Sequence, residues 1–248
     1  MSELTVSNIA KSFAKQLVLD DITFTINDGE FVSLLGPSGS GKSTLFHLIG
    51  GMYRPDRGAF FLDGKEITGK RGVISYMPQS PSLFPWRNVL SNVILGAEIH
   101  RKVDKDKARE MLKKAGLANY ENAYPHELSG GMRQRVAFVR ALLSPQDFIC
   151  LDEPFSALDE FTRLDMQTWL LDIWEKNRKS VLFITHSIEE ALYLSDRIIV
   201  LSSNPAKIKR EFDLPFQRPR EQSLLLSKDF FEWKRKIYQE LEQLKVNS

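Results

Sequence analysis

The chain has 248 residues, enough for one large domain or two small ones. It carries 34 Lys and Arg against 32 Asp and Glu, a formal net charge of +2, and 42% of its residues are hydrophobic. This near-neutral, globular composition argues against a disordered chain and against a dedicated nucleic-acid-binding protein. A single cysteine, Cys150, excludes an intramolecular disulfide and a cysteine-cluster metal site.

The sequence also bears on the compartment. No run of 18 apolar residues occurs, which argues against a membrane-spanning helix. The first residues have neither the basic nor the apolar region of a signal peptide. One cysteine fits a reducing compartment. We therefore expect a cytoplasmic protein, which could still dock on a membrane protein.

The N-terminal part of the chain is predicted to form strands. Apolar and polar residues alternate in 4–6 and in 24–26, as in half-buried strands. Residues 30–35 are mostly apolar, which is typical of a strand buried on both faces of a parallel sheet. A glycine-rich loop follows at 36–44, and residues 42–49 are compatible with a helix. This order of strand, glycine loop and helix is the context that phosphate-binding loops require.

The middle of the chain changes from strand to helix. Strands are predicted at 59–62 and 73–77, whereas residues 80–144 have a helical pattern. Within this pattern, residues 104–116 have apolar side chains at i, i+3, i+4 and i+7. Three apolar runs then predict strands again, at residues 148–151, 180–184 and 197–201. A helical pattern lies between the first two of these runs. We therefore expect a helical insert inside an α/β core.

The core pattern ends at Asn204-Pro205, and the rest of the chain reads as a tail with a final helix. That helix has apolar residues at three- and four-residue spacing: Phe230, Trp233, Ile237, Leu241 and Leu244. We predict that this stripe packs on the body of the protein. A partner-binding face remains the alternative.

The first motif with chemical meaning is the glycine loop Gly36-Pro37-Ser38-Gly39-Ser40-Gly41-Lys42-Ser43-Thr44. Glycines let the backbone approach phosphate groups closely, and successive amides form an anion-binding nest. The helix that follows adds its positive N-terminal end. Lys42 would reach the β- and γ-phosphates, and the Ser43 hydroxyl would ligate Mg²⁺.

The second motif is Phe148-Ile149-Cys150-Leu151-Asp152-Glu153, a predicted strand that ends in two carboxylates. At the C-terminal end of a parallel strand, Asp152 would face the Mg²⁺ ion beside the glycine loop. Glu153 would polarise the attacking water as a general base. An acidic strand end is common by itself, so the motif gains its meaning from the glycine loop.

The third motif is Leu128-Ser129-Gly130-Gly131-Met132. Ser129 and the glycines could open a helix whose N-terminus binds an anion, but an ordinary serine N-cap explains the same residues. These residues resemble the signature of the ATP-binding-cassette (ABC) ATPases. The resemblance extends over nearly the whole chain and is weakest in the tail. It implies that the anion at Ser129 is the γ-phosphate of ATP.

Four further residues match motifs of that family. The resemblance implies that Gln79 senses Mg²⁺ and water, that Asp159 belongs to the loop crossing a dimer interface, and that His186 contacts the γ-phosphate. Phe13 matches the aromatic residue that stacks on adenine; the family often has Tyr there, and Phe keeps the π-face.

The resemblance also implies an architecture and an assembly. The fold would be α/β, a P-loop NTPase (RecA-like) core with an N-terminal antiparallel β part and an inserted α-helical subdomain. We expect residues 1–79 and 148–204 to form the core, 80–147 the helical subdomain, and 205–248 a C-terminal tail packed on the core. A head-to-tail homodimer would bind each ATP between the glycine loop of one subunit and the signature of the other.

Details of the motifs narrow the subfamily. Met132 stands where the family most often has Gln, and Phe84, Pro85 and Trp86 follow the glutamine loop. Both features resemble cassettes that serve importers of nitrate, aliphatic sulfonates, taurine and thiamine-precursor pyrimidines. In such transporters this stretch lies beside the groove for the permease's coupling helix. Core packing is the other interpretation of Phe84 and Trp86.

We therefore expect an ATP-hydrolysing importer subunit, peripheral on the inner face of the cell membrane. Its partners would be permease subunits and, indirectly, an extracytoplasmic substrate-binding protein. An export cassette and a non-transport cassette with a soluble partner, of the iron–sulfur assembly type, remain alternatives. A scaffold without hydrolysis is disfavoured by Glu153 and His186. The transported substrate is left open.

Overall fold

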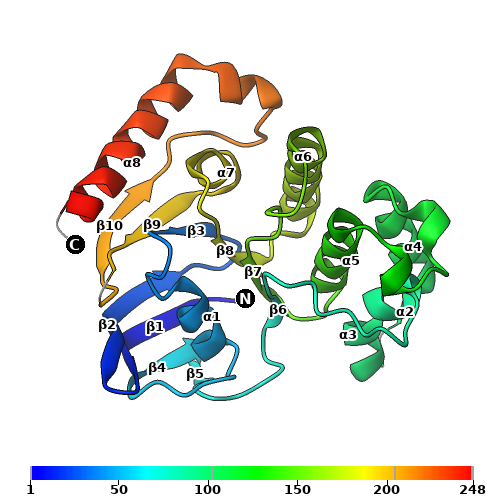
Figure 1. Ribbon diagram of the computed structural model, residues 1–248, viewed down its shortest axis with the longest axis horizontal. Helices are drawn as coiled ribbons and strands as arrows, with labels where there is room; N and C mark the ends of the chain where they lie inside the picture. The colour runs from blue at the N-terminus through cyan, green and yellow to red at the C-terminus, as the bar shows by residue number, and fades with distance from the viewer. Residues whose placement is uncertain (1, 102, 204, 247–248) are drawn as a thin grey trace.

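The computed structural model describes residues 2–101, 103–203 and 205–246, and the strands in these ranges form two sheets (Figure 1). The four-stranded sheet has the order β2-β1-β4-β5 and antiparallel pairing. Its strands are β1 (Leu4–Phe13), β2 (Gln16–Ile26), β4 (Arg57–Leu62) and β5 (Lys65–Glu66).

The six-stranded sheet has the order β10-β9-β3-β8-β7-β6. Its strands are β3 (Phe31–Leu35), β6 (Ser75–Met77), β7 (Phe148–Asp152), β8 (Ser180–Ile184), β9 (Arg197–Leu201) and β10 (Ile208–Asp213). All neighbouring pairs are parallel except β9 and β10. The fold is therefore the expected α/β core with a separate antiparallel part.

Helices follow β3, β6, β7, β8 and β10. They are α1 (Lys42–Ile49), α2 (Val89–Val93), α3 (Leu95–Ile99), α4 (Lys105–Lys114), α5 (Gly130–Leu142), α6 (Glu160–Asn177), α7 (Ile188–Leu194) and α8 (Lys228–Val246). Among the described helices, none combines the length and the apolar character that crossing a membrane requires. The helix predicted at 104–116 is confirmed as α4: Asp104 caps it by accepting from Lys107 N at 2.9 Å, and Gly116 just beyond its end has φ +69°.

The side chains of the six-stranded sheet alternate between two buried clusters. One face contributes Phe31, Leu35, Ile149, Leu151, Val181, Phe183, Ile198 and Val200, which pack with α5, α6, α7 and α8. The other contributes Val32, Leu34, Phe148, Cys150, Leu182, Ile184, Ile199 and Leu201, which pack with α1 and the antiparallel sheet. This alternation explains why the sequence of these strands is continuously apolar, since both faces are covered.

The helices between β6 and β7 have a buried cluster of their own, built from α2, α4 and α5. α2 and α4 lie away from the two sheets on the right of Figure 1, whereas α5 also packs on the six-stranded sheet. Leu83 and Trp169 pack against both this cluster and the cluster under α6. The chain therefore leaves the sheet after β6 and returns to it at β7 with a helical layer in between.

The C-terminal segment differs from a tail that only covers the core. β10 pairs antiparallel with β9, so the sheet continues past the expected boundary at residue 204 and gains an edge strand. The predicted stripe on α8 is buried as expected, with Phe230, Ile237 and Leu244 inside the cluster that also contains residues of α6 and α7. Trp233 and Leu241 are partly buried beside them. β10 therefore belongs to the sheet, because it pairs with the backbone groups at the edge of β9.

Candidate functional site

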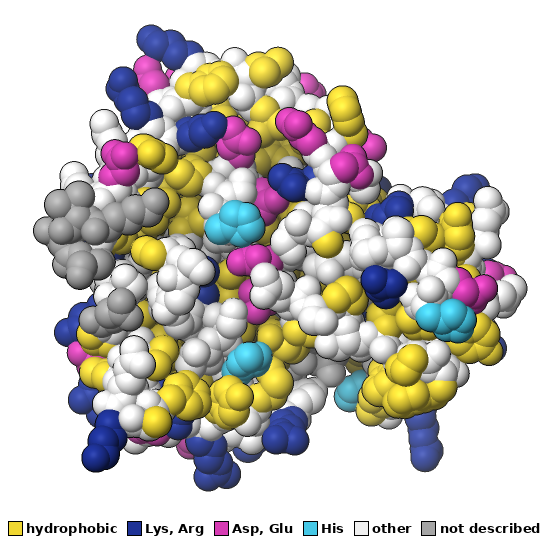
Figure 2. Space-filling model, viewed as in Figure 1, with side chains coloured by type: hydrophobic (Ala, Val, Ile, Leu, Met, Phe, Trp, Pro, Cys, Tyr) yellow, Lys and Arg dark blue, Asp and Glu magenta, His cyan; other side chains and the backbone are white. Residues whose placement is uncertain are grey.

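The chemically distinctive residues follow the C-terminal ends of neighbouring parallel strands. The glycine loop follows β3, His186 follows β8, Glu153 follows β7 and Gln79 follows β6. A cavity of about 490 Å³ joins them; it is lined by Val18, Ser38, Gly39, Ser40, Gly41, Lys42, Ser43, Thr44, Gln79, Glu153 and His186. On the face shown in Figure 2, carboxylate and histidine side chains lie next to each other near the centre. Ligands of α/β sheets bind at this edge of the strands.

The glycine loop holds a buried ammonium group. Lys42 Nζ donates to the carbonyl oxygens of Gly36 and Pro37, each at 2.8 Å, and to Ser40 Oγ at 3.3 Å. Burial lowers the pKa of Lys42, and two neighbouring carboxylates oppose that shift. The loop therefore holds the amino group of Lys42 in the lining of the cavity, where it could bind phosphate oxygens.

Gly41 is required where the loop turns into α1. Its φ is +83°, and a Cβ there would lie 2.8 Å from Leu19 Cδ2 and 3.1 Å from Val18 Cγ1. No side chain caps α1, which begins at Lys42 beside the cavity. The first amides of α1 and its positive end can therefore receive an anion.

Asp152 ends β7 as a buried carboxylate. Burial raises its pKa to about 6; the charge of Glu153 adds to the shift, whereas a hydrogen bond from the Ser43 hydroxyl and the charge of Lys42 oppose it. The Asp152 carboxylate and the Ser43 hydroxyl therefore lie within hydrogen-bonding distance of each other. This is a pair of oxygen ligands of the kind that Mg²⁺ binds together with phosphates.

Glu153 is held in an unusual backbone conformation. Its φ is +47°, which non-glycine residues rarely adopt, and its N–H donates to the carbonyl of Ile184 at 3.0 Å. Its Oε2 accepts from Gln79 Nε2 at 2.9 Å, and its Oε1 lies 3.5 Å from His186 Nδ1. The structure thus brings together the carboxylate, amide and imidazole that the sequence analysis singled out.

Gln134 contacts this site, although the sequence analysis assigned it no role there. It lies on α5, one turn after the signature residues, and is buried. Its Nε2 lies 3.3 Å from the carbonyl of Glu153 and 3.5 Å from that of Gln79. A glutamine in a helix carries no local signal for such contacts, because both carbonyls belong to residues that follow strands elsewhere in the chain.

Other candidate residues lie away from this cavity. Ser129 caps α5 by accepting from Met132 N at 3.2 Å, and Gly130 and Gly131 are the first residues of that helix. Asp159 caps α6 by accepting from Thr162 N at 3.0 Å. Among the described residues, none of these four lines the cavity at the glycine loop.

Phe13 lies at the end of β1 and is exposed. Its ring meets Tyr53 edge-on at 5.6 Å between centroids, and Lys11 Nζ lies 5.4 Å from its centroid. Val18, two residues into the next strand, lines the cavity. An aromatic ring is therefore available at the hairpin next to the glycine loop.

Phe84, Pro85 and Trp86 lie in the segment between β6 and α2. Trp86 is 71% exposed and Phe84 is half-buried, and their ring centroids lie 5.0 Å apart. Asn92 fixes this segment: its side chain accepts from Phe84 N at 2.8 Å and donates to the carbonyl of Arg87 at 2.8 Å. Core packing therefore does not account for Trp86.

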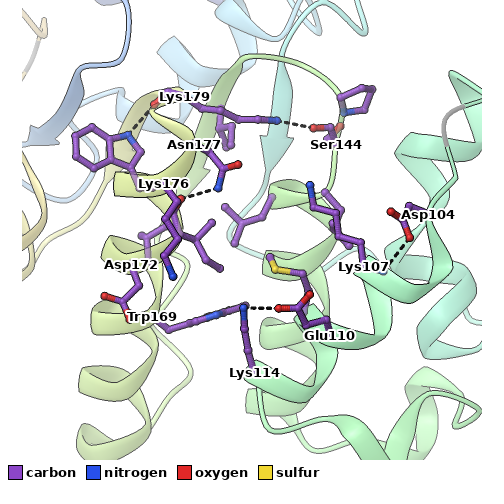
Figure 3. Close-up of a pocket in the computed structure, with 18 of the residues that line it drawn as sticks. Asp104, Lys107, Glu110, Lys114, Ser144, Trp169, Asp172, Lys176, Asn177 and Lys179 are labelled. Atoms are coloured by element: carbon purple, nitrogen blue, oxygen red, sulfur yellow. Dashed lines mark hydrogen bonds and ion pairs between the residues drawn. The ribbon is translucent and has the colours of Figure 1, made fainter.

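A larger cavity of about 630 Å³ lies between α4 and α6 (Figure 3). Met111, Trp169 and Ile173 belong to its apolar lining. Four of the described lysines line it as well: Lys107, Lys114, Lys176 and Lys179. The cavity separates the helical layer from the core on the side of α6, so an occupant would contact both.

Comparisons with known proteins show the family of this chain. A sequence profile described as ABC transporter matches residues 19–156. The uncharacterized ABC transporter ATP-binding protein MJ0412 of Methanocaldococcus jannaschii is 42% identical over 246 residues, covering 95% of this chain and 90% of that protein. The aliphatic sulfonates import ATP-binding protein SsuB of a Bacillus cereus strain is 40% identical over 243 residues, 96% of each chain. The taurine import ATP-binding protein TauB of Escherichia coli is 43% identical over 221 residues, covering 87% of this chain and 86% of that protein.

Comparison with solved structures indicates the same family. The dimeric structure of MJ0796, a bacterial ABC transporter cassette, superposes with a TM-score of 0.76 at 30% identity, covering 86% of this chain and all of that one. A dimeric post-hydrolysis state of that cassette with ADP and phosphate superposes with a TM-score of 0.75 at 31% identity, with the same coverage of both chains. The chain therefore belongs to the ABC transporter family, as a nucleotide-binding subunit and an ATPase coupled to transport.

Proposed function

We propose that this chain is the ATP-hydrolysing subunit of an import system for small organic sulfonates. The observation that carries the proposal is the cavity that joins the glycine loop to Gln79, Glu153 and His186. It provides an anion-binding loop, a carboxylate and an imidazole at one point, which is what hydrolysis of a γ-phosphate requires. The substrate class rests on the SsuB and TauB relatives.

Within this cavity each residue has a proposed part. The backbone of residues 36–44 surrounds the phosphates and Lys42 neutralises the β- and γ-phosphate oxygens. Glu153 takes a proton from the attacking water, and Gln79 and His186, which lie on either side of its carboxylate, orient the water and the γ-phosphate. Phe13 offers a face to the adenine ring.

Mg²⁺ fits the oxygen pair of Ser43 and Asp152, with Gln79 nearby. A buried carboxylate whose pKa is raised to about 6 gains from a cation, because the cation compensates for its lost hydration. Mg²⁺ usually keeps only one or two protein ligands and takes the rest from phosphates and water. When bound, the ion would neutralise charge on the β- and γ-phosphates.

The active form in this proposal is a head-to-tail homodimer. Ser129, Gly130, Gly131 and Asp159 lie outside the subunit's own cavity, at the starts of α5 and α6. Both helix starts are exposed and can face a second copy. The dimeric cassette structures with which the chain superposes support this arrangement.

We propose that Phe84, Pro85 and Trp86 contact a membrane permease from its cytoplasmic side. An exposed tryptophan is the side chain most enriched where partners bind. Leu83, which directly precedes this segment, packs against both the helical cluster and the cluster of the core, so the segment starts at the junction of the two layers. A permease segment seated there would sense the position of the helical layer relative to the core.

The proposed substrate class is based on the names of the relatives. The SsuB and TauB proteins that resemble this chain over most of its length are described as import ATP-binding proteins for aliphatic sulfonates and taurine. Both names refer to organic sulfonates. In this proposal the choice of sulfonate belongs to an extracytoplasmic binding protein, which contacts the permease and not this subunit.

Two experiments test the proposal. Mild solubilisation of native membranes containing the tagged chain should co-purify a polytopic membrane protein of importer type. In proteoliposomes with that permease and its binding protein, taurine or an alkyl sulfonate should stimulate ATP hydrolysis. The Glu153→Gln variant is the matched control, since it should co-purify the same partner and show no stimulation.

Three outcomes would replace the proposal. A soluble partner without any membrane protein would indicate a non-transport cassette of the iron–sulfur assembly type. A permease that moves its substrate outwards would indicate an export cassette. Stimulation by nitrate or a pyrimidine, and not by sulfonates, would keep the importer and reject the substrate class.

A further inference from the structure

A second carboxylate is buried close to the candidate site but outside its cavity. Glu190 lies in the first turn of α7, is 7% exposed and is absent from the cavity lining among the described residues. Burial raises its pKa, whereas hydrogen bonds and nearby positive charges oppose that shift. Burying a carboxylate is costly, so its contacts indicate what the fold gains from it.

The first set of contacts involves the residues on either side of His186 in the chain. The Thr185 hydroxyl donates to Glu190 Oε2 at 2.5 Å and accepts from the backbone N–H of Ser187 at 3.0 Å. Ser187 in turn caps α7, with its Oγ 3.3 Å from Glu190 N. The residues immediately before and after His186 are therefore both tied to Glu190.

The second set of contacts reaches the loop before α6. Gln167 Nε2 donates to Glu190 Oε1 at 3.3 Å, and Arg163 Nε lies 3.9 Å from the same oxygen. The other end of the Arg163 guanidinium donates to the carbonyl of Leu158 at 2.8 Å. Leu158 precedes Asp159, the cap of α6 that is proposed to face the second subunit.

We propose that Glu190 is a positioning residue for ATP hydrolysis: it holds the turn that carries His186 and links this turn, through Arg163, to the loop at Leu158 and Asp159. The inference rests on the proposed part of His186. Glu190 touches neither Glu153 nor the glycine loop in the contacts described, so it acts through the position of the imidazole. A movement at the dimer-facing loop would thereby change the imidazole's distance from Glu153.

The test compares two substitutions and a neighbouring control. Glu190→Ala removes every acceptor, whereas Glu190→Gln keeps one oxygen for Thr185 and loses the charge opposite Arg163. We expect Glu190→Ala to lower kcat about 10- to 100-fold, as misplacement of a reacting group does, with the Kd for ATP unchanged. Glu190→Gln should restore kcat to within about fivefold of wild type. Glu189→Gln, on the exposed side of α7, should leave kcat unchanged.

A double-mutant cycle shows whether Glu190 acts through His186. If it does, His186→Ala combined with Glu190→Ala should be no slower than His186→Ala alone. If the double variant loses kcat by the product of the two single losses, the two residues act independently and the inference is overturned. A wild-type kcat for Glu190→Ala would also overturn it. If Glu190→Ala does not fold, Thr185→Val takes its place in the cycle with the same expected pattern.

The same measurements separate this inference from the proposed function. A normal rate in His186→Ala would remove the proposed part of the imidazole, and no hydrolysis by the wild-type chain would remove the ATPase. A slow His186→Ala with a normal Glu190→Ala would reject only the positioning part of Glu190.

Discussion

The side-chain amide of Gln79 donates a hydrogen bond to the carboxylate of Glu153, with 2.9 Å between Nε2 and Oε2. The two residues are 74 positions apart and follow the neighbouring parallel strands β6 and β7. Gln79 also stands where the chain leaves the sheet for the helices of residues 80–147. The bond therefore connects the carboxylate proposed as general base to the start of the helical layer.

Replacing Glu153 by Gln should stop hydrolysis and leave ATP binding intact. The substitution removes the base but keeps the size of the side chain, so kcat should fall about 100-fold or more. ATP should then hold the subunits as a dimer that size-exclusion chromatography detects. Asp147→Asn, just before the other end of β7, is the control. Turnover at the wild-type rate would remove Glu153 from the base position.

Replacing Lys42 by Ala should weaken nucleotide binding. The ammonium is held at 2.8 Å from two loop carbonyls beside the cavity, and a charge-assisted hydrogen bond to phosphate would be lost. We expect the Kd for ATP, measured by titration calorimetry, to rise about 10- to 100-fold. Lys65→Ala on the exposed strand β5 should not change it. Unchanged binding in Lys42→Ala would contradict the assignment of the loop.

Replacing Trp86 by Ala should uncouple the subunit from its permease. Trp86 does not belong to the lining of the cavity at the glycine loop and is 71% exposed, so hydrolysis by the isolated subunit should persist. Affinity for the permease, measured in detergent, should fall about tenfold or more. Ile99→Ala is the matched control in the same layer, because Ile99 is 72% exposed. Normal transport in Trp86→Ala would mean that this segment does not contact the permease.

Replacing Asp152 by Asn should stabilise the nucleotide-free protein at neutral pH. The pKa of Asp152 is about 6 in the folded state against 3.8 ordinarily, so its ionised form opposes folding above pH 6. This cost fades as the pH falls through 6 towards 3.8. We expect a gain of about 2 to 3 kcal/mol at about pH 7.5 that shrinks by more than half at about pH 4.5, measured by urea unfolding without Mg²⁺. A gain that does not depend on pH would contradict this origin.

Much of the fold could be predicted from local pattern. The strand at 30–35, the helix at 42–49 and the helix at 104–116 correspond to β3, α1 and α4. Each prediction depends on residues within about one turn or one strand of each other, because periodicity and capping are local effects. β10 was missed for the opposite reason: its residues are mostly polar and exposed, and only the pairing with β9 makes them a strand.

The candidate site also has a part that could be predicted from the sequence and a part that could not. The residues of the glycine loop are contiguous, and the motifs at 79, 128–132, 152–153 and 186 are legible as short segments. Whether Phe84 and Trp86 pack in the core or face a partner could not be decided from the sequence, because their exposure depends on which side chains pack nearby. In the structure Trp86 is exposed and Phe84 is half-buried.

The sequence by itself therefore determined the candidate site residues and the family they resemble, since those signals are short and local. Only the tertiary structure decided that Gln79 and His186 meet on the carboxylate of Glu153, and that Glu190 is buried behind His186. Those contacts depend on the strand order β3-β8-β7-β6 and on the placement of α7 against α6. The order of strands is set by packing between distant segments, and no local pattern in the chain records it.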